Sequence, residues 1–201
     1  LEPADAQPGC DADFDPAAVG RMTVVRDPHV TVHHSAREVP DINWNAEWES
    51  SFQPVEVDGR VRIRAEFHPD GPGWEHDLLI TPRMAFGTGH HATTRMMVRA
   101  MLGMDLRGRT VCDLGCGTAV LAILAERLGA ASVLAVDNDR LAVENAEVNE
   151  RMNHCERNRV EKGDAELPKA PAHALILANI ERNTLLRTMP WLQRISARLL
   201  G

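Results

Sequence analysis

The chain has 201 residues, which is enough for one full domain and a smaller partial one. Hydrophobic residues make up 44% and charged residues 25% of the sequence, so we expect a soluble globular protein. The formal net charge of -7, without a run of Lys and Arg, argues against a nucleic acid as the main partner, because phosphate binding needs a basic face. A basic protein substrate is compatible with this charge.

Local patterns argue against three further classes of protein. No apolar run approaches the roughly 18 residues that a membrane helix needs, and the acidic, Pro-rich segment 1–15 does not resemble a signal peptide. The four cysteines form no C-x-x-C pair, and the adjacent side chains of a histidine pair on a strand point to opposite faces, so we expect no metal site. Reduced thiols and a cytoplasmic location are the resulting expectation.

The first part of the chain predicts a few short elements. Trp44, Trp48 and Phe52 recur at intervals of four, which predicts a helix with an aromatic packing face. From Val57 to Phe67 apolar and charged residues alternate, which predicts one half-buried strand, and Leu78–Ile80 predicts another.

From Thr93 onward the pattern changes to alternating strands and helices. Apolar stretches predict strands at Thr110–Leu114, Ser132–Val136, near Val160 and at Ala174–Ala178, and helical periodicity follows most of them. A last helix is expected from Glu181 to Leu200. Such alternation indicates an α/β fold with a parallel sheet that is covered on both faces.

A glycine-rich turn follows the first of these strands. Gly115 and Gly117 let the backbone approach a ligand closely, and the helix after the turn begins with unpaired N–H groups. The third glycine of the dinucleotide fingerprint is absent, because Val120 stands in its place. The turn therefore predicts a ligand site but does not favour a bound pyrophosphate.

Three polar residues follow the other strands. Asp137 lies roughly 20 positions after Gly115 and ends a strand, where a carboxylate can accept bonds from both ribose hydroxyls. The alternative role, a helix N-cap, suits Asp139 better. Asp164 follows the third strand, beside the expected position of a nucleoside base, although a plain turn is nearly as good an interpretation. Asn179 follows the fourth strand and faces the crevice, or caps the last helix.

The segment Ala85–Thr94 reads A-F-G-T-G-H-H-A-T-T and predicts a flexible loop with hydroxyl groups that could fold over the crevice as a lid. This segment, together with Asp113–Gly117, Asp137 and Asn179-Ile180, resembles the ribosomal protein L11 methyltransferases of bacteria. The family usually has Thr at His90, Pro at Ala92 and Ser-Gly at Thr118-Ala119, so the resemblance leaves fine specificity open.

The resemblance implies a class I methyltransferase with a Rossmann-like sheet that binds S-adenosylmethionine (SAM). It implies methylation of the N-terminal amine and lysines of a large-subunit ribosomal protein. Its cofactor contacts would fall at Thr94, Gly115, Asp137 and Asn179, to which Gly117 and Asp164 are added from the residue patterns above.

The resemblance also implies a division of the chain. Residues 1–38 would be the remnant of an N-terminal recognition domain, 39–83 a linker helix with leading strands, and 84–201 a SAM-binding domain that lacks its C-terminal strands. The strand at Ala174–Ala178 would then keep an unpaired apolar edge. On that expectation the 201 residues alone bind SAM poorly and methylate nothing.

Two other functions are weighed against this one. A class I methyltransferase for nucleic acids or small molecules is one alternative, but aminoadenine enzymes carry prolines and an aromatic residue after the position of Asn179, and this chain has Ile180-Glu181-Arg182. An NAD enzyme or a nucleotide-binding module without catalysis is the other, and Val120 speaks against NAD.

Overall fold

The computed structural model describes residues 53–81, 91–163, 173–195 and 199–200. The chain divides into Leu1–Asn45 and Ala46–Gly201, and everything described below belongs to the second part. The predicted remnant at 1–38 and the predicted helix around Trp44 and Trp48 lie outside the described residues. In the described parts of the chain, no helix is both long and apolar enough to cross a membrane.

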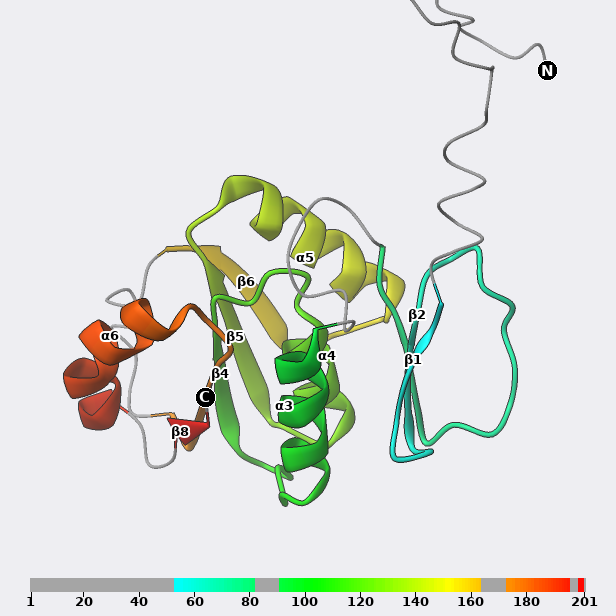
Figure 1. Cartoon of the computed structure of the whole chain (residues 1–201), viewed down its shortest axis with the longest axis horizontal. Coiled ribbons are helices and arrows are strands. Elements are labelled where there is room, and N and C mark those ends of the chain that lie inside the picture. The colour runs from blue at the N-terminus through cyan, green and yellow to red at the C-terminus, as the bar shows by residue number, and fades with distance from the viewer. Residues whose placement is uncertain (1–52, 82–90, 164–172, 196–198, 201) are drawn as a thin grey trace, which may run out of the picture. The chain divides into compact units, whose positions relative to one another are not determined.

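A parallel sheet forms the centre of the described fold (Figure 1). The described residues contribute five strands to it, in the order β6-β5-β4-β7-β8, and every neighbouring pair is parallel. The strands are β4 (Thr110–Leu114), β5 (Ser132–Asp137), β6 (Asn158–Lys162), β7 (Leu175–Ala178) and β8 (Leu199–Leu200). The predicted α/β fold with a parallel sheet is confirmed.

Helices cover both faces of this sheet. Helices α3 (Ala92–Leu102) and α4 (Val120–Arg127) share one apolar core with the strand residues Val111, Val133 and Leu177. Helix α6 (Arg182–Ile195) lies on the opposite face of the sheet (Figure 1, orange). Its Leu192 packs against Cys112, Leu114 and Ile176. The two cores follow from strict alternation along β4, whose neighbouring side chains point to opposite faces.

The predicted unpaired edge of the fourth strand is wrong. Residues 199–200 leave the helical path and pair with β7 in parallel register, Ile176 opposite Leu199 and Leu177 opposite Leu200. The predicted helix to Leu200 is too long for the same reason, because α6 ends at Ile195. The expectation of an exposed apolar edge at β7 is therefore withdrawn, and the weak SAM binding that was inferred from that edge loses its basis.

Helix α5 (Arg140–Met152) buries polar residues as well as small apolar ones. Leu141, in its first turn, is 70% exposed. Asn149 lies on the buried face of this helix, and Asn153 caps its end. A buried amide is stable only with hydrogen-bond partners, so this face is specified by polar contacts as well as by packing.

A smaller sheet precedes the main one, in the order β1-β2-β3. The expected single strand Val57–Phe67 is in fact two antiparallel strands, β1 (Val55–Val57) and β2 (Val61–Arg64), and Phe67 lies beyond them and is exposed. Asp58 and Gly59 both have positive φ, as the favoured hairpin turns require. Strand β3 (His76–Leu79) pairs in parallel with β2 and packs against α4.

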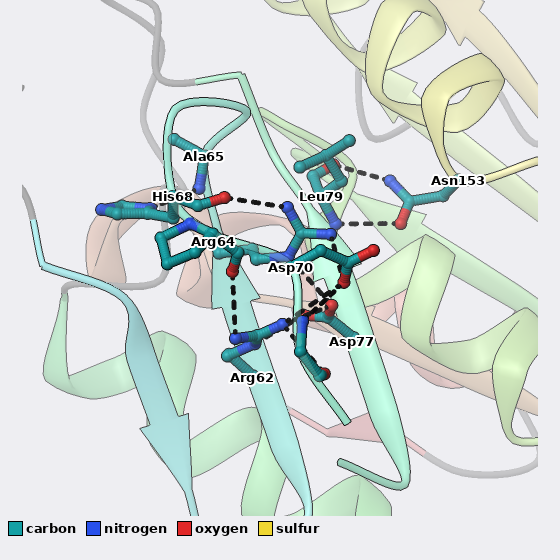
Figure 2. Close-up of polar contacts among 10 residues, drawn as sticks. Arg62, Arg64, Ala65, His68, Asp70, Asp77, Leu79 and Asn153 are labelled. Carbon is teal, nitrogen blue, oxygen red and sulfur yellow. Dashed lines mark hydrogen bonds and ion pairs between the residues drawn. The ribbon is translucent and has the colours of Figure 1, made fainter. Parts of the chain in front are cut away.

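Ion pairs hold the polar face of the smaller sheet (Figure 2). Asp77 accepts two hydrogen bonds from Arg62, at 2.9 and 2.7 Å, and one from Arg64 at 2.9 Å. Burial raises the pKa of Asp77, but the two guanidinium groups outweigh it and keep the pKa below its ordinary value. Figure 2 also shows the side-chain amide of Asn153, the C-cap of α5, bonded to the backbone of Leu79, which joins the smaller sheet to the end of α5.

Candidate functional site

The strand order reverses at one place in the main sheet. The chain runs from β4 outward through β5 to β6, and then crosses back to β7 on the other side of β4. In open parallel sheets, ligands bind outside the carboxyl ends of the strands at such a reversal. The candidate site therefore lies where the turn after β4 and the segment after β7 meet.

The glycine-rich turn is fixed to the end of β5. The backbone N–H groups of Gly115 and Cys116 both donate to Val136 O, at 2.8 and 3.0 Å. Gly115 and Gly117 have φ of 69° and 55°, a region that side chains disfavour, and Ala119 also adopts it at 62°. Ala119 stands where the resembled family has glycine, and it carries this strain without a side-chain cap for α4.

Asp137 lies directly beside this turn. Its Oδ2 accepts the Gly117 N–H at 2.9 Å, and its Oδ1 accepts the Asp139 N–H at 3.0 Å. A carboxylate has about four acceptor positions, so both oxygens keep capacity for hydroxyl groups of a ligand. Asp139, not Asp137, caps α5 through a bond from the Leu141 N–H, and that prediction is confirmed.

Thr94 and Asn179 meet on the other side of the reversal. Thr94 lies in the first turn of α3, is 1% exposed, and accepts a hydrogen bond from Asn179 Nδ2 at 3.2 Å. The alternative role of Asn179 as a helix cap is wrong, because Glu181 accepts the Asn183 and Thr184 N–H groups at the start of α6. Asn179 is therefore held by Thr94 at the carboxyl end of β7.

Gly115 and Ile180 connect the two halves of the site. A Cβ atom at Gly115 would collide with Ile180 Cγ2, so the turn after β4 and the segment after β7 are in direct contact. The structure thus brings together five of the six predicted site residues, Gly115, Gly117, Asp137, Thr94 and Asn179. The sixth, Asp164, lies outside the described residues, although Gly163 donates to Asp137 O at 2.8 Å.

The predicted lid overlaps the described residues only at its end. Ala92, Thr93 and Thr94 form the first turn of α3, capped by His91, and Thr94 is buried. A lid that includes Thr94 does not fit this arrangement. The remainder, residues 85–90, lies outside the described residues.

Asp113 belongs to the site and was missed from the sequence. It is 1% exposed, its Oδ2 accepts the Ala122 N–H of α4 at 3.1 Å, and its Oδ1 has no partner among the described residues. Burial raises its pKa to about 7, helped by the nearby carboxylates of Asp137 and Glu150 and opposed by the Ala122 bond. Its place before Gly115 in the first strand was the available signal.

Asp113 predicts a pH dependence of stability. Its folded-state pKa lies above its ordinary value, so the folded chain holds this proton more tightly than the unfolded chain. The contribution of protonated Asp113 to the unfolding free energy is complete below about pH 4 and is lost as the pH rises through about 7. We expect Asp113→Asn to flatten the fall in unfolding free energy between these values, measured by urea titration.

Glu150 provides the control for that measurement. Burial raises its pKa to about 7 as well, so Glu150→Gln should remove its own share of the pH dependence. It should reduce the share of Asp113 only slightly, because burial, and not Glu150, is the main cause of the raised Asp113 pKa. If Asp113→Asn kept the full slope of the unchanged chain, the buried carboxyl would not be the group that titrates.

Comparison with known proteins shows which family this chain resembles. Residues 13–198 match the family described as ribosomal protein L11 methyltransferase (PrmA). The chain is 46% identical over 165 residues to the ribosomal protein L11 methyltransferase of Phocaeicola vulgatus, which covers 81% of this chain and 59% of that protein. It is 46% identical over 164 residues to that of Porphyromonas gingivalis, with 81% and 57% covered.

A solved structure shares the fold. The ribosomal protein L11 methylase of Lactobacillus delbrueckii subsp. bulgaricus superposes with a TM-score of 0.66 at 28% identity, over 72% of this chain and 75% of that one. The chain spans less than three fifths of the length of the two curated relatives above.

Proposed function

The chain belongs to the ribosomal protein L11 methyltransferase family, and on that premise we propose that it binds SAM and transfers methyl groups to amino groups of ribosomal protein L11. The N-terminal amine and lysines are the proposed acceptors, and the cytoplasm is the proposed place of action. The observation that carries the proposal is the bond from the Gly117 N–H to Asp137 Oδ2 at the strand reversal. It joins the glycine turn to the carboxylate that would accept the ribose hydroxyls.

The residues present fit this cofactor. Asp137 would hold the ribose hydroxyls, because its two oxygens each use one acceptor position on backbone N–H groups and keep the other. The backbone of Gly115 and Gly117 would lie against the cofactor, and the polar groups of Thr94 and Asn179 would line the far side. Asp164 is proposed beside the base, on the strength of its position after β6.

The chain's contribution to the reaction is mainly positioning. SAM supplies an electrophilic methyl group on a sulfonium sulfur, and a neutral amine displaces that sulfur in line. The site therefore has to hold the cofactor in one orientation and keep it there while the amine approaches. The fixed turn and the Thr94–Asn179 bond are suited to this task, because both are tied to the ends of buried strands.

The proposal is tested on the substrate itself. L11 is isolated from source cells with and without the gene for this protein, and its amino groups are examined by mass spectrometry. We expect the methyl groups on its N-terminus and lysines to disappear with the gene. Unchanged methylation of L11, or a loss of methyl groups from ribosomal RNA instead, would contradict the proposed substrate.

A further inference from the structure

The start of α4 lies beside the proposed cofactor site. The N-cap of α4 is Ala119, so the Ala122 N–H is one of the first N–H groups of the helix, which have no partner within it. Here the Ala122 N–H donates to Asp113 Oδ2 at 3.1 Å, and Thr118 O accepts from Asn149 Nδ2 of α5 at 2.9 Å. Two side chains, from β4 and α5, thus bind the backbone on either side of Ala119, whose conformation is left-handed.

Asn149 makes its second contact on the opposite side. Its Oδ1 accepts the Thr81 N–H at 2.9 Å, just beyond β3. Thr81 directly precedes, in the sequence, the segment that contains the glycine and threonine motif at 86–94. Asn149 is 0% exposed, so both of its bonds are shielded from water and neither is readily replaced by solvent.

Asn153, one turn later on α5, makes similar bonds without reaching the turn. Its Oδ1 accepts the Leu79 N–H at 3.0 Å, and its Nδ2 donates to Leu79 O at 2.6 Å and Asn149 O at 2.8 Å. The two asparagines therefore both hold the smaller sheet against α5. Only Asn149 also holds the glycine-rich turn through Thr118.

We propose that Asn149 is a positioning residue for the cofactor site. It sets the glycine-rich turn at Gly117–Thr118 through Thr118 O and fixes the distance of this turn from Thr81, just beyond β3. This inference rests on the proposed binding of SAM. Asn149 does not touch the cofactor in this account. It acts through the turn, whose Gly117 N–H is bonded to Asp137 Oδ2.

The matched pair Asn149→Asp and Asn153→Asp tests the proposal. Each change keeps the shape and the Oδ1 acceptor but replaces the amide donor with an oxygen. Only Asn149→Asp places a side-chain oxygen against the carbonyl oxygen of Thr118. With both variants fully folded by urea titration, we expect Asn149→Asp to raise the Kd for S-adenosylhomocysteine at least about tenfold. Asn153→Asp should change this Kd less than about threefold.

A second readout does not depend on the cofactor. Amide hydrogen exchange at Gly117 should be faster in cofactor-free Asn149→Asp than in the unchanged chain, and unaltered in Asn153→Asp. If Asn149→Asp does not fold, Asn149→Ala removes the same donor without a charge and takes its place. Failure of the unchanged chain to bind S-adenosylhomocysteine would contradict the proposed function. Equal affinities and equal exchange in the two variants would overturn this inference alone.

Discussion

Replacing Gly115 with alanine should lower the free energy of unfolding by about 3 kcal/mol and abolish detectable cofactor binding. Two physical effects add at this position. The φ of 69° is strained for any side chain by about 1 kcal/mol, and the new Cβ would collide with Ile180 Cγ2. The collision must push apart the turn after β4 and the segment after β7, which are the two sides of the proposed site.

Gly108 separates these two effects. Its φ of 70° is nearly the same, but nothing lies within 4 Å of a Cβ placed there. Gly108→Ala should therefore lower the unfolding free energy by only about 1 kcal/mol and leave cofactor binding unchanged. Urea unfolding and calorimetry on both variants make the comparison. Equal losses in the two would show that the contact with Ile180 has no role.

Replacing Asp137 with alanine should weaken cofactor binding by about 1.5–3 kcal/mol, the usual scale for hydrogen bonds to a charged group. The carboxylate would be lost as an acceptor for ribose, and the Gly117 N–H would lose its partner. The expected rise in the Kd for S-adenosylhomocysteine is about tenfold to somewhat over a hundredfold.

Asp139→Ala is the control for that loss. It removes the cap of α5, the bond from the Leu141 N–H, and should lower stability by about 1 kcal/mol without changing the Kd. The two carboxylates lie two positions apart, so the pair separates ligand binding from helix capping. An Asp137→Ala variant with unchanged affinity would show that this carboxylate only orders the turn.

The main sheet could be predicted from the sequence because its strands are short apolar stretches bounded by turn residues. Thr110–Leu114 has the predicted bounds, and Ser132–Asp137 differs by one residue. The position of the candidate site residues at one edge of the sheet could be predicted as well, because the carboxyl ends of parallel strands lie there. Gly117, Asp137 and Asn179 each follow such a strand, and no tertiary information is needed to place them there.

The remaining features depend on contacts between distant segments. Asn149 lies on a buried helix face where periodicity predicts an apolar residue, and its partners Thr81 and Thr118 are far away in sequence. The hairpin at Asp58-Gly59 was missed because Val57 and Val61 fall on the same face of the sheet whether or not the chain turns between them. The Asp-Gly pair is nevertheless a local hairpin signal. Leu199 continues the apolar spacing of α6, so its pairing with β7 could not be read from periodicity.

Calorimetric titration of the chain with S-adenosylhomocysteine and with NADH tests the central claim most directly. A carboxylate at the end of β5 accepts the ribose of either ligand, whereas the turn Gly115-x-Gly117 with Val120 in place of a third glycine disfavours a pyrophosphate. We predict saturable binding of S-adenosylhomocysteine at one site and no binding of NADH. Binding of NADH without binding of S-adenosylhomocysteine would contradict the account.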